Sequence, residues 1–418
     1  MKNILKKSFV VLTIVVLSYI TTSLSFWLVE NRMSIFGRIF LYYTHKNYVE
    51  GNGPAPNQYR YLPYLLVDKL FKYIPVPWLD DSYNMIKTWA GYGSKEENFV
   101  RKRNLDTFFP EADRIKMAQD LEGYLREQVY SLTKNGVTAN IVMMFLNQVG
   151  WKTWITDPLN FLDSLKDIIP YEFAAVFQSN SDMTKVINGY ATYRFAFTVL
   201  SFFLLYLWLR YFADEFTSVM FLFVFSSLMP FTMMDFYQQE TMLSLALFLG
   251  VLNIAVRKKS WAWVFLIVLI GSFARSDHML FAALVFVLQD VFSHKDKKSL
   301  LRGGVLLGTP LIITFLLTKV IFADSEYYCR VVLLTCNLTN PWCWLFPVVF
   351  LILPAIFVKK AKEIQFFKKT FWWIFPFIAL NVTVGVTKEV RLFLPLLVYL
   401  LPLMAVESRK LFSEKDGV

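Results

Sequence analysis

Residues 9–29 read FVVLTIVVLSYITTSLSFWLV, and Lys2, Lys6 and Lys7 precede them. An apolar run of this length crosses about 30 Å of hydrocarbon as an α-helix. The lysines predict that its N-terminal end stays in the cytoplasm, because positively charged flanks are retained there. A charged start and an apolar run are also typical of a signal peptide. Because the run is long and no convincing small-residue cleavage site follows it, we interpret it as an uncleaved signal anchor.

The composition extends this interpretation to the rest of the chain. Its 418 residues are 56% apolar and 18% aromatic, and apolar runs alternate with charged residues. One aqueous core cannot bury so much apolar surface, so we expect an all-α polytopic membrane protein with membrane lipid as its surroundings. The formal net charge of +11 lies mainly in short loops beside the predicted spans. Membrane orientation explains that excess, so we expect no nucleic acid partner.

Nine further apolar runs predict spans, which gives about ten in all. They lie at about 190–211, 216–233, 241–256, 261–274, 278–293, 303–323, 341–358, 370–387 and 390–406. The predicted organisation is a cytoplasmic stub and first transmembrane helix (1–29), a large extracytoplasmic loop (30–189), a bundle of about nine transmembrane helices (190–407) and a cytoplasmic tail (408–418).

Basic residues in four separate loops support this topology. They lie at 257–259, 295–302, 359–369 and 409–410, all on the predicted side of the N-terminus. The positive-inside rule therefore places both termini in the cytoplasm.

The loop at 30–189 carries amphipathic patterns of its own. Apolar residues repeat every three or four positions at 115–132 and again at 62–70, which predicts helices lying at the membrane interface. The stretches 137–155 and 168–177 are also expected to lie at the interface. If they form a hairpin of two crossings instead, the count becomes twelve and every later loop keeps its side.

The chain lacks the common motifs of soluble enzymes. It contains no GxxxxGK[ST], GxGxxG, GxSxG or HExxH, which argues against phosphate-loop and serine-hydrolase chemistry. Its cysteines, Cys329, Cys336 and Cys343, lack the spacing of a zinc site. Cys329 and Cys336 are equally compatible with a disulfide and with two thiols. Asn337-Leu-Thr339 is a formal glycosylation sequon.

Polar clusters recur at the predicted external ends of the spans. They comprise Glu30-Asn-Arg32, Glu50 to Pro63, Asp235-Phe-Tyr-Gln-Gln-Glu240, Arg275-Ser-Asp-His278 and Lys388-Glu-Val-Arg391. Charges at a membrane boundary are costly unless they are paired or line a wet cavity. Two interpretations therefore stay open: ion pairs and caps at helix ends, or an external cavity. A cavity lined by arginines, acids, amides and tyrosines suits a sugar phosphate.

Three short motifs resemble known proteins. Gln58-Tyr-Arg-Tyr-Leu-Pro63, Arg275-Ser-Asp277 and Glu389-Val-Arg391-Leu-Phe-Leu-Pro395 look like patterns in uncharacterised bacterial members of the GT-C superfamily of integral membrane glycosyltransferases. The long first external loop and the many spans are similar too. The resemblance implies a GT-C-like fold in the bacterial inner membrane, with an extracytoplasmic active face. It also implies a polyprenyl-phosphate sugar donor and a glycan acceptor of the cell envelope or on a lipid.

The resemblance also implies that an acidic residue of the first external loop is the catalytic base. Here that residue is Glu50 or Glu30, with the pair Asp80-Asp81 as a third candidate. Sugar transfer needs such a base, together with positive charge to stabilise the departing phosphate. Arg60, Arg275 and Arg391 are the candidates for that charge, and Lys388 is a less specific one. The remaining candidate substrate contacts are Gln58, Tyr59, Asp235, Gln239, Glu240, Asp277, His278 and Glu389.

No set of residues demands a metal, although some GT-C members use a divalent cation. Two other functions share part of this pattern. A polysaccharide polymerase or ligase, of the kind that acts on O-antigen, needs the same lipid-phosphate contacts. A transporter of lipid-linked saccharides needs polar residues in mid-membrane and a second, cytoplasmic gate.

Overall fold

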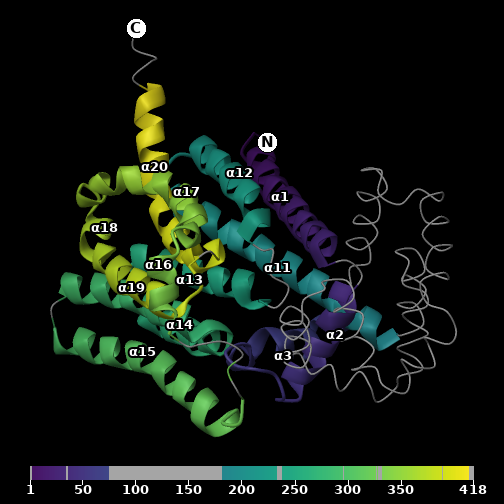
Figure 1. Ribbon diagram of the computed structural model, residues 1–418. Helices are drawn as coiled ribbons and strands as arrows, with labels where there is room; N and C mark the ends of the chain where they lie inside the picture. The colour runs from purple at the N-terminus through teal and green to yellow at the C-terminus, as the bar shows by residue number, and fades with distance from the viewer. Residues whose placement is uncertain are drawn as a thin grey trace, which may run out of the picture. The chain divides into compact units, whose positions relative to one another are not determined.

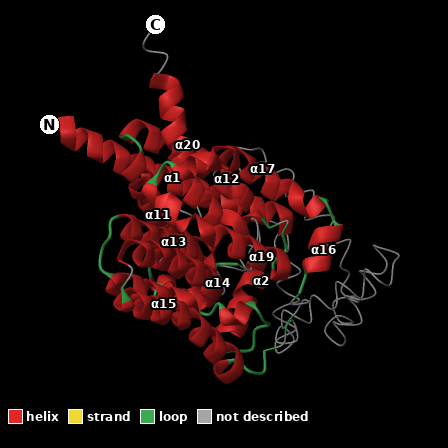
Figure 2. Ribbon diagram, turned by 90° about the vertical axis from the view of Figure 1, so that its left-hand side faces the viewer, coloured by secondary structure: helices red, strands yellow, loops and turns green. Residues whose placement is uncertain are grey.

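The computed structural model describes residues 2–33, 36–74, 181–232, 238–294, 296–325, 327, 332–387 and 389–413. The longer helices are α1 (Lys2–Met33), α2 (Phe36–Val49), α3 (Leu62–Lys69), α11 (Ser181–Phe212), α12 (Glu215–Thr232), α13 (Glu240–Val256), α14 (Trp261–His294), α15 (Lys297–Leu316), α16 (Leu334–Thr339), α17 (Trp342–Ile356), α18 (Gln365–Thr370), α19 (Ile374–Val384) and α20 (Leu394–Ser413). Short helical turns are η1 (Asn57–Tyr59), η2 (Phe71–Tyr73), η4 (Leu317–Ile321), η5 (Phe357–Lys362), η6 (Phe371–Trp373) and η7 (Val390–Phe393). Over these ranges Figure 2 shows helices and loops without a strand, which confirms the all-α expectation.

In the described part of the chain, five helical segments are long and apolar enough to cross a membrane. They are Lys6–Ser25, Lys185–Phe212, Trp261–Val291, Lys297–Ile321 and Val390–Ser408. Shorter apolar helices cover Glu215–Met229 and Glu240–Val256. The chain therefore has the helix lengths and composition of a polytopic membrane protein. Ten crossings and the sidedness of the loops stay predictions.

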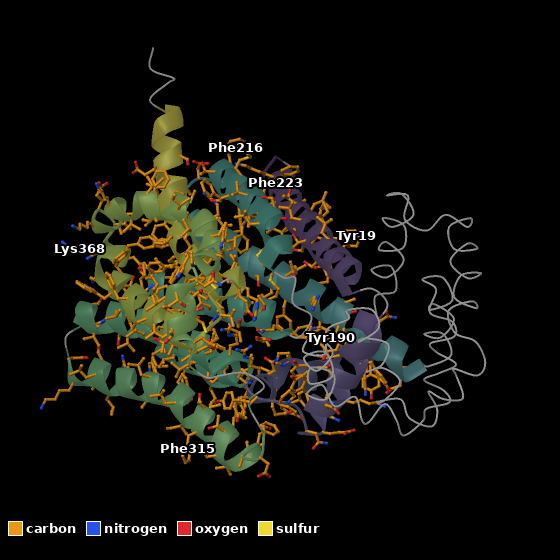
Figure 3. All side chains as sticks on the ribbon, viewed as in Figure 1. Tyr19, Tyr190, Phe216, Phe223, Phe315 and Lys368 are labelled. Carbon is orange, nitrogen blue, oxygen red and sulfur yellow. The ribbon has the colours of Figure 1, made fainter. Side chains whose placement is uncertain are left out.

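Apolar side chains cover the outside of the helices. Figure 3 shows Phe216 and Phe223 pointing outward from α12 and Phe315 pointing outward from α15; their exposed fractions are 76%, 47% and 60%. Rings so exposed to solvent would be unfavourable in water, whereas lipid chains accommodate them. The outward faces of α12 and α15 are therefore suited to lipid.

The structure divides into two compact units. The first, here called the bundle unit, comprises Met1–Ser25, Tyr59–Pro63 and Arg194–Val418. The second, called the insertion unit, comprises Phe26–Gln58 and Tyr64–Tyr193.

Helices α13 and α20 form the centre of the bundle unit. Almost every residue of α13 is buried, and so is every residue from 390 to 403. Two core aromatic rings bond through their polar atoms: Trp208 Nε1 donates to the Val398 carbonyl at 3.0 Å, and the hydroxyls of Tyr399 and Thr370 lie 2.8 Å apart. These bonds link α11 and α18 to α20.

Hydroxyl groups attach the first helix to its neighbours. The Thr21 and Ser226 hydroxyls lie 2.9 Å apart, and Lys6 pairs with Glu215 at 3.3 Å. Figure 1 shows α1 running beside α12 accordingly. Small hydroxylated residues let membrane helices approach closely, so this contact holds the first span on the bundle.

Helix α14 breaks at Arg275, where the backbone has φ −156° and ψ 91°. A Cβ on Gly271 would lie only 2.5 Å from Met279 Sδ. Eight residues of straight helix span about 12 Å, so the chain must bend sharply at the break. The sequence predicts a short loop at 275–278 between two spans. The structure instead confines the interruption to Arg275 and continues as helix on either side.

The insertion unit is built on α2 and α3. Helix α3 confirms that the stretch predicted at 62–70 is helical, and its placement at the membrane interface stays a prediction. His45 of α2 lies 2.8 Å from the Tyr190 hydroxyl and 3.8 Å from Asp68. Burial lowers the pKa of His45 to about 4 in spite of the nearby carboxylate, which Lys72 already neutralises in part. The patterns predicted at 115–132, 137–155 and 168–177 lie outside the described residues.

Candidate functional site

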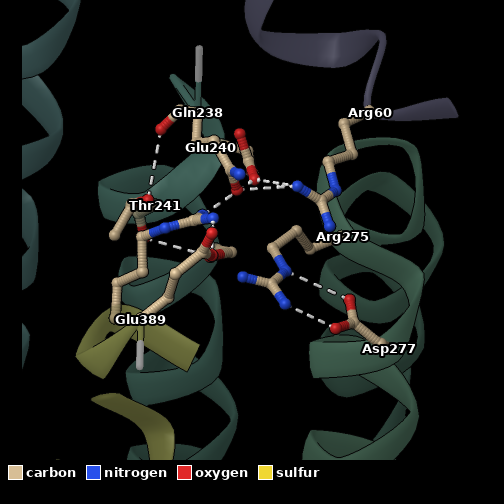
Figure 4. Close-up of polar contacts among 9 residues, drawn as sticks. Arg60, Gln238, Glu240, Thr241, Arg275, Asp277 and Glu389 are labelled. Atoms are coloured by element: carbon tan, nitrogen blue, oxygen red, sulfur yellow. Dashed lines mark hydrogen bonds and ion pairs between the residues drawn. The ribbon is translucent and has the colours of Figure 1, made fainter. Parts of the chain in front are cut away.

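Glu240 is the centre of a buried ion cluster in the bundle unit. It begins α13, and only 1% of its side chain is exposed. Arg60 Nη1 donates to Glu240 Oε1 at 2.8 Å, and Arg391 Nη1 lies 3.7 Å from the same oxygen. Arg60 Nη1 also donates to Gln238 Oε1 at 2.8 Å (Figure 4). One carboxylate thus holds two arginines that come from opposite ends of the chain.

Arg391 lies in the turn η7 immediately before α20. Its side chain is 4% exposed and also pairs with Glu389, whose side chain is 28% exposed. Glu389 precedes the turn, so its carboxylate reaches the accessible edge of the cluster while Arg391 stays inside. The motif Glu389-Val-Arg391 thereby contributes one carboxylate and one guanidinium group to the cluster around Glu240.

Arg275 occupies the break in α14 and is almost fully enclosed. Its Nε donates to Asp277 Oδ1 at 3.1 Å and its Nη2 to Oδ2 at 2.6 Å, a bidentate pair. The Asp277 side chain is 34% exposed, against 1% for Arg275. Figure 4 shows the Arg275 guanidinium between Asp277 and the group formed by Glu240 and Glu389. The neighbouring His278 is buried, and the charges of Arg275, Arg60 and Arg391 all act on its ring.

A fourth arginine joins the cluster from α11. Arg194 Nε donates to Gln239 Oε1 at 2.8 Å, and the residue is 3% exposed. We did not predict Arg194 as a site residue. The available signal is an arginine inside an otherwise apolar helix, which is costly in a membrane unless it is paired or functional.

The cluster has a positive charge balance. In the described part of the chain, four guanidinium groups face three carboxylates, with Gln238 and Gln239 as neutral partners. Buried arginines are costly unless anions or dipoles compensate them. Planar guanidinium groups are also the side chains best suited to bidentate contact with phosphate. The arrangement is therefore capable of binding an anion of lipid or sugar phosphate type.

Of the other predicted site residues, the structure describes the side chains of Glu50, Gln58 and Tyr59. Glu50 is exposed and belongs to the insertion unit, in the turn that follows α2. Glu30 lies in α1, and its side chain is outside the described part, as are Asp80, Asp81, Asp235 and Lys388. Tyr59 belongs to the bundle unit, where its hydroxyl approaches the Ser325 carbonyl at 3.4 Å.

Gln58 has a role within its own loop. It is fully buried, accepts from the Gly53 amide at 2.8 Å and donates to the Tyr48 carbonyl at 3.0 Å. A Cβ on Gly53 would collide with Tyr48 at 2.0 Å, so the loop closes only around glycine. Both ends of the Gln58 amide thus hold the loop together.

Other candidate chemistry is sparse. Cys336 and Cys343 are free thiols, whereas Cys329 lies outside the described residues. Over the described ranges, no three His, Cys, Asp or Glu side chains come together as metal ligands would.

Comparison with known proteins places no further constraint on the chain: no family model, no curated protein and no solved structure matches it.

Proposed function

We propose that this protein is a membrane glycosyltransferase of GT-C type. It takes a sugar from a polyprenyl-phosphate-linked donor and transfers it to an envelope or lipid-linked glycan on the extracytoplasmic side. The observation that carries the proposal is the buried cluster of Arg60, Arg194, Arg275 and Arg391 in a chain of membrane-spanning character. Guanidinium groups bind phosphate well, and their position among membrane-spanning helices suits a phosphate that is attached to a lipid.

The distribution of charge suggests which part of the cluster binds the phosphate and which part binds the sugar. Arg60, Arg194 and Arg391 surround Glu240 and its neighbouring glutamines, and this part has more positive than negative charge. It is the better place for the phosphate. The bidentate pair of Arg275 and Asp277 is neutral as a unit and partly exposed, so it suits the hydroxyl groups of a sugar.

The proposed reaction is a substitution at the anomeric carbon. The acceptor hydroxyl oxygen forms a bond to that carbon, and the bond from the carbon to the phosphate oxygen breaks. The bonding electrons stay on the phosphate, where the arginines stabilise the added charge. The acceptor proton passes to a carboxylate, for which Glu50 and Glu30 are the candidates. Glu240 is unsuited to that task because two arginines already hold it.

The test measures sugar transfer by purified protein in lipid nanodiscs supplied with a polyprenyl-phosphate sugar. Arg391→Gln and Arg275→Gln should each lower kcat/KM by about a hundredfold, the scale of a lost charged contact to a transition state. Arg391→Lys should restore little, because an ammonium lacks the planar fork. Arg302→Gln is the matched control, since Arg302 lies over the Trp261 ring, away from the cluster.

Two results would count against the proposal. Equal transfer by all four variants would remove the arginines from the mechanism. Movement of the intact donor across the bilayer, without transfer, would favour a transporter. Product length gives a further distinction, because a polymerase extends chains of preassembled repeats. The base is tested separately with Glu50→Gln and Glu30→Gln, one of which should abolish transfer while leaving donor binding intact.

A further inference from the structure

Asn337 lies at the centre of a compact set of hydrogen bonds in the bundle unit. It belongs to α16 and is 2% exposed. Its Nδ2 donates to the carbonyls of Val382 at 2.8 Å and Gly385 at 2.7 Å, and its Oδ1 accepts from the Thr387 hydroxyl at 3.0 Å. All the bonding capacity of one side-chain amide is thus directed at residues 382–387.

Residues 382–387 lead directly into the part of the ion cluster that contains Arg391. Helix α19 ends at Val384, and η7 begins at Val390. Among the described residues between them, the bonds from backbone to backbone are short-range, such as Glu389 N to the Val386 carbonyl at 2.9 Å. Gly385 is tightly packed, since a Cβ there would lie 2.7 Å from the Asn381 carbonyl oxygen. The path of this segment therefore depends on contacts from outside it, and Asn337 supplies three of them.

We infer that Asn337 is a positioning residue for Arg391. By holding residues 382–387, it sets where η7 starts and hence where the Arg391 guanidinium meets Glu240. The inference rests on the proposed function for its binding readout, although the positioning itself can be measured without ligand. The same bonds engage both side-chain atoms of the sequon residue Asn337, so the folded chain has no free amide there to carry a glycan.

A buried asparagine can also matter for stability alone, so the test needs a matched control. Asn253 near the other end of α13 is that control. It is buried, and its Nδ2 donates to the Leu204 and Leu249 carbonyls at 2.9 Å each. It lies thirteen residues along the helix from Glu240, which is about 20 Å. Asn337→Ala and Asn253→Ala therefore remove similar bonds, one set beside the cluster and one set distant from it.

The first measurement is hydrogen–deuterium exchange of the full-length protein in nanodiscs. Asn337→Ala should raise amide exchange in residues 385–393 severalfold, and Asn253→Ala should not. Unchanged exchange in Asn337→Ala overturns the inference, whatever the protein binds. If Asn337→Ala does not fold, Thr387→Val removes the hydroxyl contact to Oδ1 and keeps the backbone amide contact at 3.4 Å. It should give a smaller rise in the same peptide; no rise there overturns the inference equally.

The second measurement is the affinity for a polyprenyl phosphate. Asn337→Ala should weaken Kd about tenfold, or 1.4 kcal/mol. Combined with Arg391→Gln it should add little, because both changes act through one guanidinium. Full additivity, or equal loss in Asn253→Ala, overturns the inference. If the wild-type protein binds no polyprenyl phosphate while the exchange result holds, the proposed function fails and the positioning role stands.

Discussion

Arg60 Nη1 donates a hydrogen bond to Glu240 Oε1 at 2.8 Å, although 180 positions separate the two residues. The same glutamate lies 3.7 Å from Arg391 Nη1. Glu240 thus acts as an internal counter-ion for both arginines. In the proposed function, the donor phosphate competes with this carboxylate for the same guanidinium groups.

Replacing Glu240 by glutamine should therefore tighten phosphate binding. Glutamine keeps the oxygen that accepts from Arg60 but removes the competing negative charge. We expect the Kd for a polyprenyl phosphate to fall roughly tenfold, or about 1.4 kcal/mol. Titration in nanodiscs measures it, with the exposed Glu363→Gln as a control for net charge. Weaker binding by Glu240→Gln would show that the carboxylate organises the arginines more than it competes.

Arg194 and Arg210 offer a comparison on one helix. Both lie on α11, but Arg194 is buried against Gln239, whereas Arg210 is exposed and donates to the Ala213 carbonyl. Arg194→Gln should weaken polyprenyl phosphate binding about tenfold or more, in the range of a charged hydrogen bond. Arg210→Gln should leave it unchanged. Similar values for the two variants would remove Arg194 from the site.

Two adjacent glycines of α15 test the packing of the bundle. A Cβ on Gly303 would lie 3.0 Å from Val287 Cγ1, whereas a Cβ on Gly304 has nothing within 4 Å. Gly303→Leu should destabilise the protein by about 1–3 kcal/mol through overpacking. Gly304→Leu should be close to neutral, because its side chain extends outward. Thermal unfolding in detergent compares them; equal Tm values would contradict the packing of α14 on α15.

His45 predicts loss of stability in acid. Its pKa is about 4 in the folded protein, below the ordinary 6.5, because burial disfavours the charged ring. The unfolded chain therefore binds a proton first, and stability that is complete above pH 6.5 falls as the pH drops toward 4. The loss at pH 5 should be roughly 2 kcal/mol. The nearby Asp68, with its pKa lowered below the ordinary 3.8, titrates only under more acidic conditions.

The measurement is the free energy of unfolding at pH 7 and pH 5. His45→Gln should be less stable than wild type at pH 7 but should lose less stability on acidification. If the two proteins lose the same amount between these pH values, His45 is not the group responsible.

The sequence predicted helix positions well, for a simple physical reason. A span needs an unbroken apolar run, and charges mark where it ends; the run 241–256 and the observed Glu240–Val256 differ by one residue. The sequence predicts a loop at 275–278, whereas the structure has a helix with a break at Arg275 alone. The extent of this break depends on packing, as between Gly271 and Met279, and a local sequence pattern does not reveal packing partners.

Most members of the candidate site could be predicted from the sequence, with Arg194 as the exception, but their pairing could not. Arg60, Arg275 and Arg391 stood out because charges at span ends are costly. Which acid each one meets depends on the tertiary fold, so the sequence predicted Glu240 as a substrate contact but not as the shared partner of Arg60 and Arg391. The sequence predicts Gln58 as a substrate contact because it lies in a conspicuous polar motif. In the structure its side-chain amide bonds within its own loop.

The ion cluster also bears on how the protein is made. Of the three residues that it joins, Arg60 is synthesised first, then Glu240, and Arg391 after both. Until η7 and α20 are in place, Glu240 therefore lacks one of its two arginine partners. Helices that pack before then carry a poorly compensated acid. Pairing of Glu240 with Arg391 would thus make the docking of α20 part of neutralising the core.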